Sequence, residues 1–353
     1  MSYYLHPAAR SHLKFIKPFS IVANFNYGVT NKVNTNPYLL DYSLYPDLEH
    51  TQLKFQFLKY LSSSQMKLGN LDVNNLLFTA GASEAIELVI KSFCEPAQDI
   101  VCVTPPTFSL YEDLSKRHNC SITKVNLLGA NFESLNVSKI LTVKPKVVFL
   151  CSPNNPVGTM LSYVEVERLL VSVTDSLVVM DETYIDFATD QNLLPLIEKY
   201  SNFVIIRSFS KSWGLAGIRA GIVIANNIII NTLKLIQLPY SFSSLAQESI
   251  LSRITNTIQI SQSIQQIIKE RDRIHMILKN EVKDITKIYP SFTNFITACF
   301  INHSAYLKLL KQHHMLVTDI DSLIPCGIRL SIYNEKYNDQ LISIIQKVQR
   351  SNE

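Results

Sequence analysis

The sequence has no concentrated block of one charge. Its 353 residues carry a net charge of +4, and the 33 lysines and arginines are spread along the chain without a long basic run. Proteins that bind nucleic acids cluster basic residues on one face. The charge distribution therefore argues against a nucleic-acid partner and favours small molecules as partners.

Long apolar runs are also missing. The N-terminal segment MSYYLHPAARSHLKF has no continuous apolar core, and the most aliphatic later stretch, 218–238, is interrupted by residues such as Arg219, Asn226 and Lys234. We therefore expect neither a signal peptide nor a membrane span.

Cysteine pairs and several common site motifs are absent. The six cysteines, Cys94, Cys102, Cys120, Cys151, Cys299 and Cys326, stand singly without a CxxC pair, which is typical of reduced, buried thiols in a cytoplasmic protein. The adjacent His313 and His314 are interpreted as surface residues, so no metal site is expected. Because GxxxxGK[ST], GxGxxG and GxSxG are missing, a P-loop, a dinucleotide-binding fold and a serine hydrolase are disfavoured.

Short aliphatic runs do recur, with helix-like segments between them. They lie at 99–103, 147–151, 177–180, 203–206 and 221–224. Runs without polar alternation are typical of strands covered on both faces, so they predict an α/β fold with a largely parallel sheet. After residue 243 the pattern changes to a long amphipathic helix at 258–278, strand-like segments at 295–301 and 328–332, and helices at 305–312 and the C-terminus. This part predicts a smaller α+β domain.

Polar side chains follow three of these runs. The segment 152–158 follows the second run, Asp181–Tyr184 follow the third, and Arg207–Lys211 follow the fourth. Open α/β sheets bind ligands at the carboxyl ends of their strands. Upstream, the small residues at 79–83 lead into a helix with apolar residues at 86, 89, 90 and 93. An ordinary capped helix has this pattern, and so does a helix whose free N–H groups bind phosphate.

These groups match the needs of pyridoxal phosphate. Its aldehyde needs an amine, its pyridine nitrogen needs a carboxylate, and its phosphate needs hydroxyls, N–H groups and a guanidinium. Lys211 supplies the amine and Asp181 the carboxylate, while Ser208, Ser210 and Arg219 suit the phosphate.

In these residues the sequence resembles the fold type I pyridoxal-phosphate enzymes of the aspartate aminotransferase superfamily, and among them the histidinol-phosphate aminotransferases. The matching stretches are Tyr45–Asp47, 79–96, TPPTFSLY (104–111), VVFLCSPNNPVG (147–158), VVMDETYIDF (178–187), SFSKSWGLAGIRAG (208–221) and, less strongly, SFTNFI (291–296) and GIRLSIYN (327–334). The resemblance implies a large domain with a mostly parallel central sheet covered by helices (30–243), a small α+β domain (244–353), and an N-terminal arm (1–29) that packs with the small domain.

The resemblance also implies the role of each site residue. Lys211 forms the Schiff base and then moves a proton between substrate and cofactor, Asp181 pairs with the pyridine nitrogen, and Asn155 and Tyr184 bind the ring hydroxyl. The other cofactor-binding residues that it implies are Ala82, Ser83, Phe108, Ser208, Ser210, Arg219 and Tyr45. Tyr45 would reach the cofactor of a second subunit, which implies a homodimer. The residues implied at the substrate are Arg329, Asn155 and Tyr27, and the Asn155–Pro156 bond is implied to be cis.

The implied reaction is amino transfer between histidinol phosphate or imidazole-acetol phosphate and glutamate or 2-oxoglutarate. Two segments depart from the family's pattern. Asn24–Gly28 lacks a glutamate and a proline, and Thr318 stands where the family has an arginine that binds the substrate phosphate. Two alternatives therefore stay open: another reaction on the same cofactor, such as decarboxylation of threonine phosphate or transamination of an aromatic or other amino acid, and a non-catalytic regulator that binds pyridoxal phosphate.

Overall fold

A computed structural model describes residues 45–63, 68–188 and 192–352 of the chain. The predicted N-terminal arm (1–29), with Tyr27, lies outside the described residues. The described part contains two β-sheets. The strands of the larger sheet are β1 (Leu76–Thr79), β2 (Ile100–Val103), β3 (Ser121–Lys124), β4 (Val147–Cys151), β5 (Leu177–Asp181), β6 (Phe203–Ser208) and β7 (Gly221–Ala225).

The larger sheet has the strand order β1-β7-β6-β5-β4-β2-β3. The neighbours β3, β2, β4, β5 and β6 all pair in parallel, which confirms the largely parallel sheet predicted from the aliphatic runs. The strand β7 departs from this pattern, because it is antiparallel to both β6 and β1. The connection from β6 to β7 contains no full helix, and a parallel crossover usually needs one.

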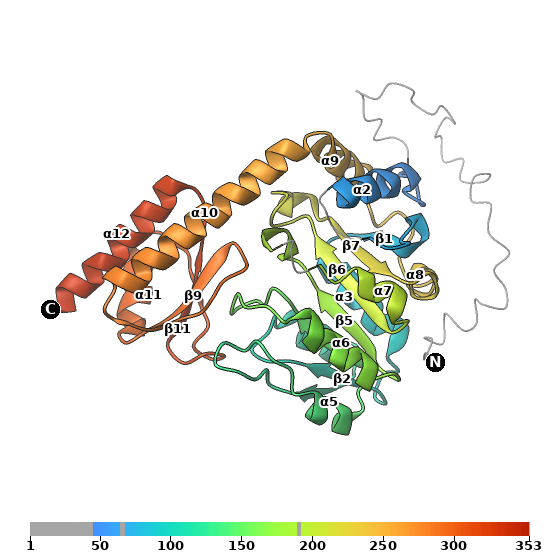
Figure 1. The fold of residues 1–353 in the computed structure, drawn as a ribbon, viewed down its shortest axis with the longest axis horizontal. Helices are drawn as coiled ribbons and strands as arrows, with labels where there is room; N and C mark the ends of the chain where they lie inside the picture. The colour runs from blue at the N-terminus through green and yellow to red at the C-terminus, as the bar shows by residue number, and fades with distance from the viewer. Residues whose placement is uncertain (1–44, 64–67, 189–191, 353) are drawn as a thin grey trace.

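Helices cover both faces of this sheet (Figure 1). On one face lie α3 (Ala82–Phe93), α4 (Leu110–Arg117) and α8 (Asn227–Lys234), and on the other lie α2 (Thr51–Ser63), α5 (Val137–Val143), α6 (Tyr163–Ser172), α7 (Pro195–Lys199) and α9 (Ser244–Ile254). Along β4, Val147 and Phe149 pack on the first face, and Val148 and Leu150 pack on the second. Both sets of alternating side chains are therefore buried, which explains why the strand sequences are uninterrupted aliphatic runs.

A capping side chain marks the start of four of these helices, α5, α6, α8 and α9. Ser162, Asn226 and Ser243 accept hydrogen bonds from backbone N–H groups in the first turns of α6, α8 and α9. Such caps satisfy N–H groups that have no partner within the helix. The helix α3, which Gly81 precedes, has no capping side chain, and neither do α4 and α7.

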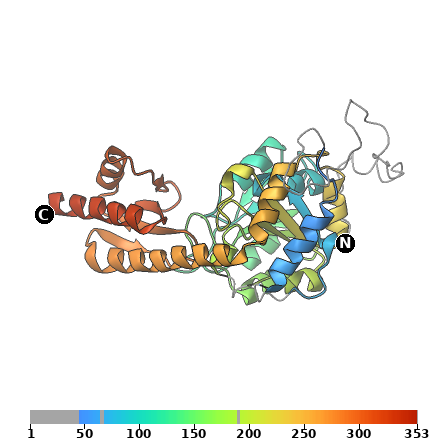
Figure 2. The ribbon, with the colours of Figure 1, turned by 90° about the horizontal axis from the view of Figure 1, so that it is seen from above.

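The second sheet is smaller and antiparallel, with the order β10-β11-β9-β8. Its elements are β8 (Ile285–Ile288), β9 (Phe295–Phe300), β10 (Thr318–Asp319) and β11 (Gly327–Ser331), with the helices α11 (His303–Gln312) and α12 (Glu335–Asn352). The helix α10 (Thr257–Glu281) runs from the larger body to the smaller one (Figure 2). Ile260 and Ile264 of α10 pack in the core of the larger sheet, whereas Ile274 and Leu278 pack in the core of the smaller one.

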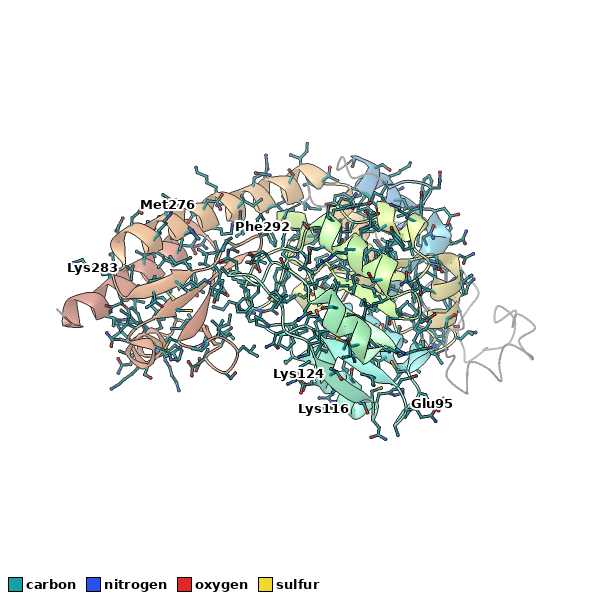
Figure 3. All side chains as sticks on the ribbon, turned by 60° about the horizontal axis from the view of Figure 1, so that its bottom comes forward. Glu95, Lys116, Lys124, Met276, Lys283 and Phe292 are labelled. Atoms are coloured by element: carbon teal, nitrogen blue, oxygen red, sulfur yellow. The ribbon has the colours of Figure 1, made fainter. Side chains whose placement is uncertain are left out.

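The two bodies meet beside the loop that follows β4. The backbone N–H of Phe292, which is labelled in Figure 3 between the two bodies, donates a hydrogen bond to the carbonyl of Gly158 at 2.8 Å. The Thr297 hydroxyl donates to the carbonyl of Pro156. The Asn155–Pro156 bond is cis, as the resemblance implied. The smaller body therefore contacts the loop that carries Asn155.

The remaining expectations concern thiols, metals and membranes. All six cysteines are free and five of them are buried, which agrees with the predicted burial. Among the described residues, no group of three or more histidine, cysteine or acidic side chains is arranged to hold a metal ion. Within the same ranges, no helix combines the length and the apolar character needed to cross a membrane.

Candidate functional site

The carboxyl ends of three neighbouring parallel strands open into one cavity. The strands are β4, β5 and β6, and the cavity has a volume of about 190 Å³. Its lining is formed by Ala82, Ser83, Phe108, Cys151, Asn155, Asp181, Thr183, Tyr184, Ser208, Ser210, Lys211, Ala216 and Arg219. Ten of these thirteen residues were predicted as site residues from the sequence, although they come from segments far apart along the chain. Parallel strands in an open sheet bring such segments to one edge.

One end of the cavity is formed by the start of α3 together with Arg219. Gly81 has a φ of 83°, and a Cβ at this position would lie 2.6 Å from Nη2 of Arg219. A Cβ on Gly221 would lie 2.5 Å from the carbonyl carbon of Gly81. A Cβ at Gly81 would displace the end of the Arg219 side chain, and a Cβ at Gly221 would displace the backbone, so the two glycines let Arg219 and the helix start approach closely. We call Gly81, Ala82, Ser83 and Arg219 the anion cradle, since uncapped N–H groups and a guanidinium both bind anions.

A buried carboxylate lies at the end of β5. Asp181 is 3% exposed, its Oδ1 accepts a hydrogen bond from the Thr183 N–H at 2.9 Å, and its Oδ2 accepts one from the Tyr111 hydroxyl at 2.7 Å. Burial raises the pKa of Asp181, and the hydrogen bonds from Thr183 and Tyr111 and the charge of Lys211 act in the opposite direction. The protein thus provides donors that favour the ionised carboxylate despite its burial.

Lys211 provides the amine of the site. Desolvation and the positive charges of Arg329 and Arg219 lower the pKa of Lys211, whereas Asp181 acts to raise it. Its Nζ lies 5.7 Å from the centre of the Tyr184 ring. A lowered pKa increases the neutral fraction of the amine, and the neutral amine is the form that attacks a carbonyl carbon.

A second guanidinium, that of Arg329, reaches the site from the smaller sheet. Its Nη1 donates to Oδ1 of Asn155 at 2.5 Å, and its Nη2 donates to the Thr318 hydroxyl at 3.0 Å. The guanidinium also lies 4.9 Å from the centre of the Phe295 ring. Its hydrogen-bond partners here are neutral, so the positive charge is available to an anionic group.

The loops of the site are held by contacts that the sequence did not reveal. Asp186 accepts hydrogen bonds from the Ser212 hydroxyl and from the Trp213 indole N–H, the two residues that follow Lys211. On the adjacent strand ends, Glu182 and Arg207 form a buried ion pair with an Oε2 to Nη2 distance of 2.7 Å. Each pair joins residues well separated in the sequence, so single-chain motifs gave no signal for them.

Not every predicted site residue lines the cavity. Tyr45 is 60% exposed and its ring centre lies 4.5 Å from that of Tyr240, away from the lining residues. Its predicted contact is with a second subunit, so it stays a prediction, as does Tyr27 outside the described residues. Cys151, Thr183 and Ala216 line the cavity but were not predicted. They are neighbours of predicted residues within the same strand-end segments, and that proximity is the signal that could have found them.

The donor set fits pyridoxal phosphate. The anion cradle suits a phosphate, the buried and hydrogen-bonded Asp181 suits a protonated ring nitrogen, and Lys211 suits an aldehyde. Gly81 and Gly221 lie within two of the motifs that suggested this cofactor, and the structure adds the close approach of Arg219 to the start of α3 that they permit.

Comparison with proteins of known sequence agrees with this geometry. A histidinol-phosphate aminotransferase from Cytophaga hutchinsonii is 30% identical, and the alignment covers 98% of this chain and 99% of that protein. A histidinol-phosphate aminotransferase from Parabacteroides distasonis is 31% identical over 98% of this chain and 99% of its own length.

Solved structures show the same fold. A histidinol-phosphate aminotransferase from Clostridium acetobutylicum superimposes with a TM-score of 0.77 at 23% identity, covering 87% of this chain and 91% of that one. One from Sinorhizobium meliloti, in complex with pyridoxal-5'-phosphate, gives 0.76 at 20% identity, covering 88% and 84%. An L-threonine-O-3-phosphate decarboxylase from Porphyromonas gingivalis gives 0.71 at 22% identity, covering 87% and 91%.

The family model for aminotransferase class I and II matches residues 40–345, which is most of the chain. This match agrees with the near-complete coverage of the relatives, and it includes every element that lines the cavity. The chain therefore belongs to the aminotransferase class I and II family and is a transaminase of fold type I that depends on pyridoxal phosphate.

Proposed function

We propose that this transaminase exchanges the amino group between L-histidinol phosphate and 2-oxoglutarate, giving imidazole-acetol phosphate and L-glutamate, a step of histidine biosynthesis. The observation that carries the proposal is the similarity, over nearly the whole chain, to relatives named histidinol-phosphate aminotransferase. An amino donor and a 2-oxo acid acceptor are the partners that follow from the reaction. We place the enzyme in the cytoplasm, in keeping with its free cysteines.

The cofactor supplies an aldehyde and an electron-accepting ring. In our proposal Lys211 binds the aldehyde carbon, and its amine later moves the proton at the substrate Cα. Asp181 holds a proton on the ring nitrogen. Tyr184 and Asn155 bind the ring hydroxyl, and since Asn155 already accepts from Arg329 through Oδ1, its Nδ2 is the donor for this purpose.

The proposed phosphate-binding residues are those of the anion cradle and two serines of β6 and its following loop. Ala82 and Ser83 contribute backbone N–H groups, Ser208 and Ser210 contribute hydroxyls, and Arg219 contributes a guanidinium. Phe108 lies beside them in the lining, and we propose that it stacks on the cofactor ring.

Arg329 is the proposed anchor for the anionic end of the substrate, with Tyr27 as a further contact. The neighbouring strand β10 places Thr318 against Arg329, where the family has an arginine. Loss of one guanidinium weakens binding of a phosphate by about 1.5–3 kcal/mol. The alternative within the same class is therefore an amino acid or amino phosphate with a different anionic end, either transaminated or decarboxylated.

We further propose a homodimer in which Tyr45 reaches the cofactor of the partner subunit. Large apolar side chains with exposed fractions above one third lie on neighbouring segments, namely Tyr45, Leu48, Phe55, Leu238 and Leu245. Exposed apolar groups in such number support a protein partner. Within each subunit we propose an arm at 1–29, a cofactor domain at 30–243 and a small domain at 244–353, although α9 and the first half of α10 pack in the core of the larger sheet.

The test is an absorbance spectrum of the protein loaded with pyridoxal phosphate, before and after addition of glutamate and, separately, of histidinol phosphate. Conversion to the pyridoxamine form with both compounds is expected. A response to glutamate alone would show that the second substrate is a compound other than histidinol phosphate. Release of CO₂ from threonine phosphate without amino transfer would show that the reaction is decarboxylation and not transamination. Lys211→Ala is the control, because without the amine the absorbance band and turnover should both disappear.

A further inference from the structure

Asp181 accepts a hydrogen bond from a buried tyrosine, Tyr111, that does not line the cavity. Tyr111, in the first turn of α4, is fully buried, and its hydroxyl donates to Oδ2 of Asp181 at 2.7 Å. Its ring is parallel to that of Phe149, with ring centres 5.0 Å apart and an interplanar angle of 1°. The tyrosine does not line the cavity, so its hydroxyl reaches a reacting group only through Asp181.

Besides Asp181, the hydroxyl has the thiol of Cys151, at the end of β4, as a neighbouring hydrogen-bond partner, and otherwise its surroundings are apolar. Phe149 covers one side of the ring, and the Phe108 ring meets it edge-on with centres 5.7 Å apart. A side chain without solvent contact cannot exchange its hydrogen bond for one to bulk water. The direction of the bond is also set, because an ionised carboxylate only accepts and the phenol must donate.

We propose that Tyr111 is a positioning residue for Asp181: its hydroxyl keeps the carboxylate ionised and oriented toward the cavity, and so keeps the proton on the ring nitrogen of the cofactor. The inference rests on the proposed role of Asp181. A buried acid facing a ring nitrogen can exist as an ion pair or as a neutral pair with the proton on the acid. A weakly polar interior favours the neutral pair, and a strong hydrogen-bond donor to the carboxylate shifts the equilibrium back to the ion pair.

The experiment uses the holoenzyme loaded with cofactor labelled with ¹⁵N in the ring, since the nitrogen resonance distinguishes a protonated from a neutral ring. In Tyr111→Phe the resonance should move toward the neutral value. The turnover number should fall about tenfold to a hundredfold, the effect of losing one hydrogen bond to a charged group, while KM changes little. The matched control is Tyr306→Phe, because Tyr306 is equally buried and donates to Oδ2 of Asp284 at 3.0 Å in the smaller body.

A third variant replaces Tyr111 with p-aminophenylalanine, which keeps a weaker donor at the same reach. Its resonance should lie between those of the wild type and Tyr111→Phe, and it carries the test alone if Tyr111→Phe does not fold. An unchanged resonance in the folded variants would overturn the proposal, even if turnover fell. An equal shift in Tyr306→Phe would overturn it as well.

Asp181→Asn separates this inference from the proposed function. If the resonance in Asp181→Asn is that of the wild type, the role proposed for Asp181 fails, and the role of Tyr111 fails with it. If Asp181→Asn gives a neutral ring nitrogen but Tyr111→Phe does not, only the inference about Tyr111 is overturned.

Discussion

At the residue scale, the anion cradle depends on the absence of side chains at two positions. In Gly221→Ala the added Cβ would lie 2.5 Å from the carbonyl carbon of Gly81 and 2.6 Å from the amide nitrogen of Ala82. Both atoms belong to the backbone, so the start of α3 must shift. We expect the affinity for pyridoxal phosphate to fall about tenfold or more and the free energy of unfolding to fall by about 1–3 kcal/mol. Titration of the apoprotein with cofactor and urea denaturation measure the two effects.

The matched control for this substitution is Gly217→Ala. Gly217 lies four residues before Gly221, in the connection between β6 and β7, yet no atom lies within 4 Å of the position that its Cβ would take. Its cofactor affinity should therefore equal that of the wild type. Equal affinities in both variants would contradict the role assigned to the close approach at Gly221.

A second residue-scale prediction concerns Lys54 of α2, which is 4% exposed. Desolvation, followed by the charge of Lys234, lowers the pKa of Lys54 to about 8, whereas Glu49, whose Oε2 lies 3.9 Å from Nζ, and Asp47 act to raise it. Below pH 8 the amine is charged in both the folded and the unfolded state, so folding carries the full free-energy cost of burying the charged amine. That cost declines between pH 8 and the ordinary pKa near 10.5, as the folded protein releases its proton first.

Lys54→Met should therefore be more stable than the wild type at pH 7, by about 1–2 kcal/mol after allowance for screening by water. The difference should shrink as the pH approaches 10. Lys59→Met is the control, because Lys59 lies on the exposed side of the same helix. Denaturation curves at pH 7 and pH 10 measure the difference in stability between Lys54→Met and the wild type. A difference that grows with pH would contradict the predicted direction of the pH dependence.

At the element scale, the ends of β5 and β6 are joined by the ion pair of Glu182 and Arg207. The side chains are 0% and 6% exposed, respectively, and each stands next to a site residue, Asp181 or Ser208. Removing one partner of a buried ion pair leaves an uncompensated charge and costs about 3–5 kcal/mol. Arg207→Met should therefore lower the free energy of unfolding by this amount and reduce cofactor affinity, as measured by urea denaturation and cofactor titration.

The double variant Glu182→Leu with Arg207→Met tests the cause. Replacing both charges with apolar groups removes the uncompensated charge, so most of the lost stability should return. If the double variant is as unstable as Arg207→Met, the loss comes from packing and not from the unpaired carboxylate.

The elements that the sequence predicted best are those buried on both faces. β4 was predicted with the bounds that the structure shows, and β2, β5, β6 and β7 to within two residues at either end, because aliphatic runs of this length fit strands and are too short for most helices. The strand β1 was not predicted, although all four of its residues are buried. The strands β3, β8 and β10 were not predicted either. Their sequences are short and partly exposed, and they become strands only through pairing with a neighbour. The reversed direction of β7 likewise depends on topology, which a run of aliphatic residues does not encode.

The site was predictable to the extent that its residues follow those strands. Asp181, Lys211 and Asn155 could be predicted because the carboxyl ends of parallel strands meet at one edge. The hydrogen-bond and ion-pair partners that hold the site residues and their neighbours could not be predicted. Tyr111 lies 70 positions from Asp181, and the pairs of Asp186 with Trp213 and of Glu182 with Arg207 span 27 and 25 positions. Such contacts depend on strand order and register, and motifs in a single sequence do not determine either of them.

At the scale of the whole molecule, the proposed dimer makes each active site a product of two chains. Lys211 would come from one subunit and Tyr45 from the other. Tyr45→Ala and Lys211→Ala should each be nearly inactive alone. After denaturation and refolding as an equal mixture, half of the dimers would be mixed, and each mixed dimer would contain one site with both residues intact. The mixture should therefore recover about a quarter of the wild-type activity.

The control mixture combines Lys211→Ala with Asp181→Ala. Both residues line the same cavity of one chain, so no mixed dimer of these variants contains an intact site and activity should stay at the level of the parents. Recovery in the first mixture alone would place Tyr45 in the partner's site. If neither mixture recovers activity although sedimentation shows mixed dimers, Tyr45 acts within its own subunit or not at all. The exposed apolar surface would then serve dimer contact without completing the site. That surface is formed by Tyr45, Leu48, Phe55, Leu238 and Leu245.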